Sequence, residues 1–280
     1  MTHSADLPRL YRGQINLWVE DAVTHQYLEE LWLGSPVQFL IGGGSSGVGA
    51  VANDARANGY SNVFGLVDRD FGPTNYSHWD DETKGFLRFV LPVFELENYL
   101  LDARSLAESD VNTAGKTQAD IEAIMRDRAS ELVWWMTCRD VIARLRQCIL
   151  DDFMKQPKWT DIADLAGAEE YILQSKWHAN ISSRVDRIAS EMEVRAMLED
   201  AHAQYDSQLA SDKWLRSFSG KEILRHVRSR VYNPPVRPAS QSDLDADVAK
   251  SVAKCQMESE GMPQDLADLL TALKRKAGVP

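Results

Sequence analysis

The sequence lacks the features of membrane, secreted and zinc-binding proteins. Its 280 residues contain no apolar run of about 18 residues, the length that a membrane-spanning helix needs. Residues 1–13 have no apolar core of the kind found in a signal peptide. Three cysteines, Cys138, Cys148 and Cys255, show no C-x-x-C spacing, which argues for a reducing compartment and against a zinc site. We therefore expect a cytoplasmic protein.

Nucleotide and histidine motifs are also missing. The glycine-rich stretch at 42–49 reads GGGSSGVG, but no G-K-[ST] follows it, so it is not the phosphate-binding loop of an ATPase. It is either a turn that leads into a helix or a backbone nest that approaches a phosphate. No two of the six histidines have H-x-x-x-H spacing. We expect no cofactor beyond a metal ion.

Charge and length further narrow the classes of protein to which the chain can belong. The formal net charge of −11 argues against a surface coated with basic residues, although it allows a local basic patch. An apolar content of 44% is ordinary and is enough for a sizeable core. A chain of this length suits one large domain or two.

Strand-like and helix-like patterns alternate in the first hundred residues. Short apolar runs at 15–19, 37–41, 62–67 and 86–91 predict strands, and the periodicity of 21–33 and 48–58 predicts helices between them. This alternation predicts right-handed crossovers and a mainly parallel sheet flanked by helices.

The character of the sequence changes after about residue 102. Helical periodicity is visible at 118–150, 160–175, 180–210, 219–231 and 262–276, and the Pro- and Ser-rich stretch 232–243 predicts a loop. The sequence therefore predicts an α/β domain over 1–108 and an α-helical domain over 109–280. We expect the helical part to supply dimerisation, partner and substrate contacts.

Acidic residues follow two of the expected strands. Glu20 directly follows the apolar run 15–19, and Asp68 and Asp70 follow the run 62–67. If the strand continues, Asp68 and Asp70 point the same way and Arg69 points opposite. Carboxylates that meet at strand ends repel unless a cation lies between them, which favours a Mg²⁺ site. The alternative is an ordinary loop whose aspartates cap backbone N–H groups.

Two further glutamates lie in the apolar stretch 91–101, LPVFELENYLL. Charges among apolar residues are costly unless they are paired or bound, so Glu95 and Glu97 are candidate ligands of the same metal. In an extended backbone both face one side, whereas in a helix they diverge by roughly 200° and only one reaches the metal. The alternative is a pair of acids that complements a helix N-terminus.

The most basic stretch of the chain is 213–237. On a helix that starts near Ser219, three of its cations share one face, which suits contact with a nucleic-acid backbone: Lys221, Arg225 and Arg228. A solvated face, or ion pairs with the acidic body of the protein, is the alternative.

The order of the acids along the chain resembles the pattern of the Toprim domain, which topoisomerases, primases and OLD-type nucleases share. The acids are Glu20, the Asp68-x-Asp70 pair and Glu95 or Glu97. The resemblance covers roughly 14–105 and is closest to the OLD-like and DUF4435 branch, which has strings similar to GLVDRDF, VFELENYLL and, near Lys221, FSGKE. Within that branch, the Toprim effector of the PARIS anti-phage defence system is similar in size and layout.

The resemblance implies a Toprim (Rossmann-like) fold and a Mg²⁺-dependent endonuclease. Glu20 would act as metal ligand or general base, Asp68 and Asp70 would hold the metal, Glu95 and Glu97 would complete its shell, and Lys221 would stabilise charge on the phosphoryl group. One or two Mg²⁺ ions are expected, with Mn²⁺ as a substitute. Thr24 stands where the branch often has a second acid. Two alternatives follow: Asp21 compensates for the missing acid, or one metal ion is bound more weakly.

The same resemblance implies a toxic effector that cleaves host tRNA. It would be held by a separate ABC-type ATPase and released by a phage trigger. The homodimer is a separate expectation, because the apolar stripes of the helical part exceed what covering one sheet requires. Two alternatives remain open at this point: a DNA nickase of the OLD type, and a non-catalytic regulatory subunit that docks on an ATPase.

Overall fold

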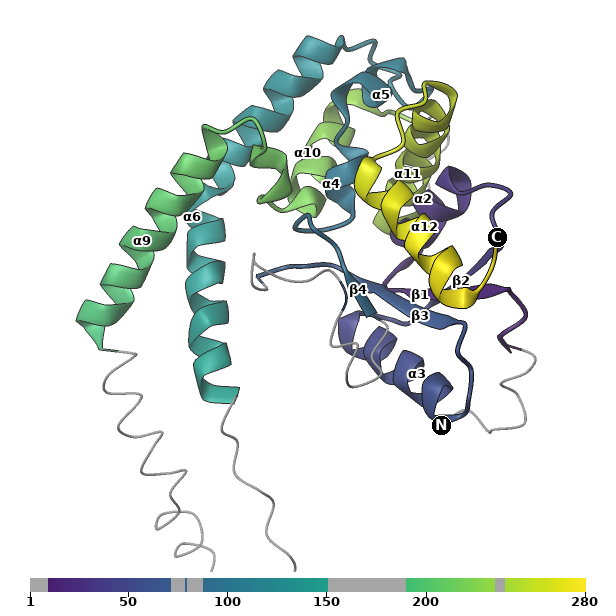
Figure 1. Cartoon of the computed structure of the whole chain (residues 1–280). Coiled ribbons are helices and arrows are strands. Elements are labelled where there is room, and N and C mark those ends of the chain that lie inside the picture. Colours follow the sequence, from purple (N-terminus) through teal and green to yellow (C-terminus); the bar gives the residue numbers. More distant parts are fainter. Residues whose placement is uncertain (1–9, 72–78, 80–87, 151–189, 235–239) are drawn as a thin grey trace, which may run out of the picture. The chain divides into compact units, whose positions relative to one another are not determined.

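A computed structural model describes residues 10–71, 79, 88–150, 190–234 and 240–280 of the chain (Figure 1). The chain forms two compact units. The first combines residues 1–130 with 213–280, and the second comprises 131–212. This division differs from the predicted boundary after residue 108, because the C-terminal helices belong to the same unit as the sheet.

The strands of the described residues form one parallel sheet in the order β2-β1-β3-β4. They are β1 (Ile15–Val19), β2 (Val37–Ile41), β3 (Val63–Val67) and β4 (Arg88–Val90). The predicted bounds of β1 and β2 match the structure, and β3 starts one residue later than predicted. The parallel sheet and its flanking helices confirm the predicted α/β class.

The two central strands are covered on both faces. Every residue of β1 and β3 is buried, whereas the edge strand β2 is partly exposed. Leu17 of β1 lies in register between Phe39 of β2 and Phe64 of β3. Continuous apolar runs, rather than alternating ones, are what a parallel sheet buried on both faces requires.

Helices lie on both faces of the sheet (Figure 1). Helix α3 (Ser45–Ala57) covers one face. Helix α2 (Ala22–Leu31) lies on the other face, together with the C-terminal helices α11 (Gln241–Glu258) and α12 (Gln264–Ala277). Val48 and Ala55 of α3 pack with Trp18 of β1 in one buried cluster. Gly65 of β3 permits this close approach, because a Cβ atom there would lie 2.7 Å from Cγ1 of Val48.

The chain after β4 adds helices to the first unit. They are α4 (Glu97–Leu100), α5 (Ala103–Glu108), the part of α6 (Gln118–Leu150) up to Ser130, the 3-10 helix η3 (Trp214–Arg216), α10 (Gly220–Val231), α11 and α12. Helix α11 packs along α2, and Gln256 joins it to the body of the unit. Its amide oxygen accepts from Tyr27 Oη at 2.6 Å, and its amide nitrogen donates to the Tyr99 carbonyl at 3.0 Å.

The sequence did not predict α11. The predicted loop 232–243 includes its first residues, and no helix was expected over 244–258. Its buried face consists mainly of small residues, Val248, Ala249, Val252 and Ala253, among many charged ones. Such a face gives a weak apolar period, although it allows close packing against α2.

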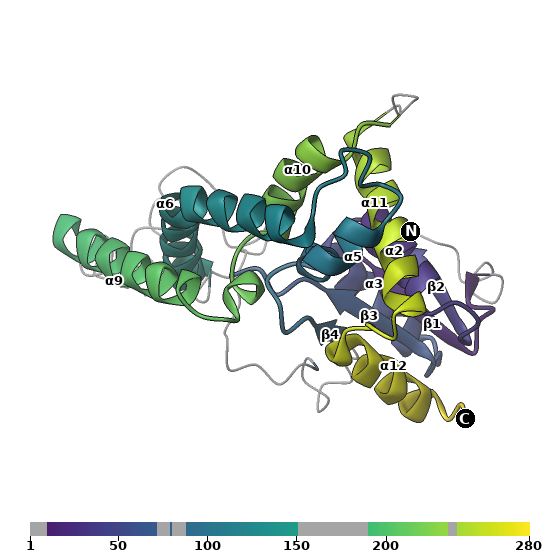
Figure 2. The same ribbon diagram turned by 90° about the horizontal axis from the view of Figure 1, so that it is seen from above.

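The second unit contains the later part of α6 (Gln118–Leu150) and α9 (Glu191–Leu209), which lie next to each other (Figure 2). Arg144 of α6 pairs with Asp140 of the same helix at 2.7 Å and with Asp200 of α9 at 3.2 Å. The predicted helix at 160–175 and the first ten residues of that at 180–210 lie outside the described residues. Among the helices of the described ranges, none is long and apolar enough to cross a membrane.

Candidate metal centre

The carboxyl ends of β1 and β3 form a switch point in the sheet. From β1 the chain moves to β2 on one side, and it then crosses to β3 on the other. Glu20 directly follows β1 and Asp68 directly follows β3. The N–H of Asp68 donates to Oε1 of Glu20 at 2.9 Å. Ligands of open parallel sheets bind at this kind of position, so both acids stand where a ligand is expected.

The glycine-rich loop after β2 holds the backbone of Glu20. The N–H groups of Gly43 and Gly44 both donate to the Glu20 carbonyl at 3.1 Å. Both glycines have positive φ values, 76° and 106°, which other residues rarely adopt. These two N–H groups therefore anchor the acid, and α3 begins directly after them.

The segment between β4 and α4 brings two more acids beside Asp68. The N–H of Leu96 donates to Oδ1 of Asp68 at 2.9 Å. On either side of Leu96, Glu95 precedes α4 and Glu97 begins it, and both side chains are buried. Although a helix starts here, both carboxylates reach the same cluster, because only Glu97 is in the helix.

Asn98 ties this segment to the residues before α10. Its amide oxygen accepts from the N–H of Glu95 at 2.7 Å, and its amide nitrogen donates to the carbonyls of Leu215 and Phe218 at 2.5 and 2.9 Å. Asn98 was not expected as a site residue. The signal in the sequence is a polar side chain within the apolar stretch 91–101.

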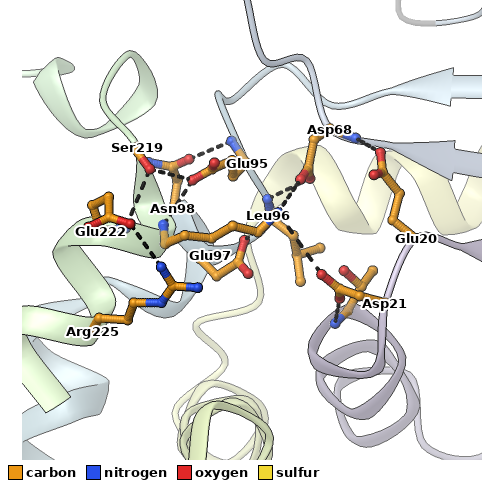
Figure 3. A network of polar contacts seen from close by, with 12 residues as sticks. Glu20, Asp21, Asp68, Glu95, Leu96, Glu97, Asn98, Ser219, Glu222 and Arg225 are labelled. Carbon is orange, nitrogen blue, oxygen red and sulfur yellow. Dashed lines mark hydrogen bonds and ion pairs between the residues drawn. The ribbon is translucent and has the colours of Figure 1, made fainter. Parts of the chain in front are cut away.

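The N-terminus of α10 docks on Glu95. Ser219 Oγ and the N–H of Lys221 donate to Oε2 of Glu95 at 2.9 and 2.8 Å, while Ser219 also caps the helix (Figure 3). Gly220 allows this contact, because a Cβ atom there would lie 2.6 Å from the nitrogen of Asn98. Glu95 therefore positions α10 and, with it, Lys221.

The ammonium group of Lys221 lies among carboxylates from three parts of the chain. Its Nζ donates to Oδ2 of Asp68 at 2.9 Å and lies 4.0 Å from Oδ2 of Asp21 and 4.0 Å from Oε2 of Glu97. Asp68 and Glu97 have side chains that are only 7% and 5% exposed. We refer to the acids around this ammonium group as the carboxylate cluster: Glu20, Asp21, Asp68, Glu95 and Glu97.

Asp21 and Asp70 differ in their positions relative to the carboxylate cluster. Asp21 caps α2 by accepting from the N–H of Thr24 at 2.9 Å, and its other oxygen faces Lys221, so it does stand in the cluster. Thr24 itself is buried. Asp70 does not continue β3, which ends at Val67. It is exposed, its φ is +48°, and its N–H donates to the Phe94 carbonyl at 2.9 Å.

The alignment of Asp68 with Asp70 required a strand that continues through both residues, and this condition is not met because β3 ends at Val67. Arg69 turns inward between them and donates to the carbonyls of Pro92 and Arg216. The charge of Asp70 still acts on the cluster, because it adds to the raised pKa values of Glu20 and Asp68.

Burial makes full ionisation of the cluster costly. Burial, with the charge of Asp68 next, raises the pKa of Glu20 to about 7. Burial is also the largest reason that the pKa values of Asp68 and Glu95 are raised and that of Glu97 is raised well above its usual range. Burial opposes the charge on Lys221, but the carboxylates outweigh it and raise its pKa. One ammonium group thus compensates several acids only in part.

The cluster fits a hard cation in its chemistry. Oxygen ligands of carboxylates are what Mg²⁺ and Mn²⁺ prefer, with water completing the shell. Oε2 of Glu97 is buried and accepts no hydrogen bond, so it is free to accept a metal ion. Within the described ranges, no three carboxylate, histidine or cysteine side chains are arranged to hold an ion directly, and the Lys221 ammonium group lies among the acids instead.

The remaining predicted basic residues are paired within the protein. Arg225 is 54% exposed and contacts Glu222 at 2.8 Å. Arg228 is 8% exposed and pairs with Asp245 of α11. The position of Arg228 thus agrees with the alternative of an internal ion pair, while Arg225 lies at the surface.

No protein-family model matches the chain, and a search of curated proteins finds no match either.

Proposed function

We propose that the chain is a metal-dependent endonuclease that hydrolyses phosphodiester bonds. The observation that carries this proposal is the carboxylate cluster at the carboxyl ends of β1 and β3, with the unbonded oxygen of Glu97 inside it. Burying so many acids with one lysine costs stability, which is reasonable where a divalent ion is to be held. The resemblance of Glu20, Asp68 and Asp70 to the Toprim pattern supports the same reading.

The cluster divides into ligands and supports in this proposal. Asp68, Glu20 and Glu97 would hold one or two Mg²⁺ or Mn²⁺ ions, with Asp21 or the nearby Asp70 as a further ligand. A bound ion of this kind activates water and offsets charge on a phosphate. Glu95 keeps α10 in place through its contacts with Ser219 and the Lys221 backbone.

The substrate and the biological setting rest on the resemblance to the OLD-like branch. It favours host tRNA as substrate, a role in anti-phage defence and an ABC-type ATPase as controlling partner. A homodimer is proposed on the separate ground that the helical part has more apolar stripes than covering one sheet requires. The exposed Arg225 supports contact with a nucleic-acid backbone, and the buried Arg228 does not.

A cleavage assay tests the function and separates the substrates. The purified chain is incubated with total tRNA and with supercoiled plasmid, in Mg²⁺, in Mn²⁺ and in EDTA. Metal-dependent cleavage of tRNA supports the proposal as stated, and nicking of the plasmid alone supports a DNA nickase of the OLD type. If the chain cuts neither substrate in any metal, also after release from an ATPase partner, the nuclease proposal is wrong.

One observation favours a second candidate, a non-catalytic regulatory subunit that docks on an ATPase. Lys221 already pairs with Asp68 at 2.9 Å, so the cluster is partly neutralised from within the chain. A structural role of the acids would explain this pair. Binding to an ATPase together with the absence of any cleavage would favour this candidate.

A further inference from the structure

We propose that Lys221 and a divalent cation compete for the same carboxylates: the ammonium group holds the cluster together without metal, and it leaves when the ion binds. The inference rests on the proposed function, because the ion is the one that the nuclease would use. It adds a role for Lys221 in controlling when the cluster takes up metal.

The first support is the position of the ammonium group. Nζ of Lys221 lies within 4.0 Å of oxygens from Asp21, Asp68 and Glu97, which follow β1, follow β3 and begin α4. A metal ion that bridges these three elements has to take much the same place. Two positive groups this close repel each other strongly in a buried site, so they exclude one another.

The second support is that lysine satisfies the cluster incompletely. An ammonium group has three N–H donors, yet only the contact with Asp68 has hydrogen-bond length, and the other two acids are 4.0 Å away. Oε2 of Glu97 accepts no hydrogen bond. An ion with two positive charges and about six ligand positions compensates these acids better.

The third support is that the side chain of Lys221 can move into solvent, whereas its backbone is held in place. The backbone is fixed by the bond from its N–H to Glu95 and by the close contact of Gly220 with Asn98. The side chain, in contrast, is 32% exposed at the edge of the cluster. Rotation of its flexible carbon chain moves the charge into solvent without moving α10. A phosphate brought to the metal would then meet this charge.

A titration with Mn²⁺ tests the competition. Free Mn²⁺ is counted by electron paramagnetic resonance for the full chain, for Lys221→Met and for Arg230→Met. Arg230 lies on the same helix and is exposed, so its variant controls for the loss of one positive charge. We expect Lys221→Met to bind Mn²⁺ at least about tenfold more tightly than the wild type, and Arg230→Met to bind within about twofold of it.

The outcomes separate this inference from the proposed function. Equal or weaker Mn²⁺ binding by Lys221→Met overturns the competition and leaves the metal site standing. Absence of Mn²⁺ binding by all three proteins overturns both. Circular dichroism shows whether the variant is folded.

A second measurement uses only the wild type, in case Lys221→Met does not fold. Amine acetylation is followed by mass spectrometry, with the exposed Lys254 as internal reference. We expect Mg²⁺ to increase the acetylation of Lys221 severalfold relative to Lys254, because the freed amine is more accessible. Unchanged or decreased acetylation of Lys221 at a Mg²⁺ concentration that saturates the protein would overturn the inference.

Discussion

The backbone N–H of Asp68 donates a hydrogen bond to the side chain of Glu20 at 2.9 Å, across 48 positions of sequence. This bond joins the ends of two neighbouring parallel strands and holds the Glu20 carboxylate beside Asp68. It also uses only one oxygen of Glu20, so the carboxylate keeps capacity for a ligand.

Replacing Glu97 with Gln separates function from stability. Because its pKa is raised well above the usual range and its Oε2 accepts no hydrogen bond, the neutral amide fits the metal-free fold at least as well as the acid. We expect unchanged or higher stability in urea unfolding with EDTA, and cleavage reduced by about a hundredfold or more.

The control for that variant is Glu108→Gln, which removes an exposed acid paired with Arg104. Its effect on cleavage and on stability should be small, since exposed ion pairs contribute little. If Glu97→Gln cleaves as fast as the wild type at limiting Mg²⁺, Glu97 is not a ligand of the metal.

The sequence predicted the sheet and most of the cluster, because both depend on local patterns. Continuous apolar runs identified β1 and β3, and acids at their ends identified Glu20 and Asp68. The fate of Asp70 could not be predicted in this way, because it depends on the point where β3 ends and on the bond from its N–H to the Phe94 carbonyl.

Long-range pairing explains the other differences. The internal ion pair of Arg228 requires Asp245, which lies on a helix that the sequence did not predict. That helix packs on α2 through small residues, so its apolar period is weak. Similarly, the link from Asn98 to the residues before α10 joins positions more than a hundred apart, which periodicity does not detect.

Gly220→Ala should loosen the docking of α10. The new Cβ would lie 2.6 Å from the nitrogen of Asn98 and 2.8 Å from the carbonyl carbon of Glu97, and both are backbone atoms that cannot yield without moving α4. We expect a loss of about 1–3 kcal/mol in the free energy of unfolding and lower cleavage, because Lys221 and Glu95 shift apart.

Gly49→Ala is the matched control. Gly49 lies inside α3, and a Cβ there meets only Nη1 of Arg88 at an ordinary 3.6 Å. Alanine favours helix, so this variant should be as stable as the wild type or gain up to about 1 kcal/mol. If both variants unfold alike in urea, the close approach at Gly220 is not needed.

Stability without metal should depend on pH through the cluster. The pKa of Glu20 in the folded chain, about 7, is above the value of 4.5 for the free side chain. Because the pKa of Glu20 is raised on folding, its carboxyl group contributes to the free energy of unfolding. The contribution is fully present below the unfolded pKa and is lost as pH rises through the folded pKa of about 7. In EDTA we expect the free energy of unfolding to fall between about pH 5 and pH 8.

Glu20→Gln isolates this contribution, since other groups also titrate in that range. The variant should show a shallower fall with pH than the wild type in the same urea titrations. Mg²⁺ should stabilise the wild type more at pH 8 than at pH 6, because metal and protons compete for the acids. Parallel pH profiles of wild type and Glu20→Gln would contradict the assignment.

Direct binding of Mg²⁺ to the chain and to Asp68→Asn, measured by isothermal titration calorimetry, tests the central claim. Asparagine preserves an oxygen for the Leu96 N–H but removes the charge that faces Lys221. The account predicts that the wild type binds one or two ions and that Asp68→Asn, folded by circular dichroism, binds at least about tenfold more weakly. Equal affinity in both proteins, or no binding by the wild type, would contradict it.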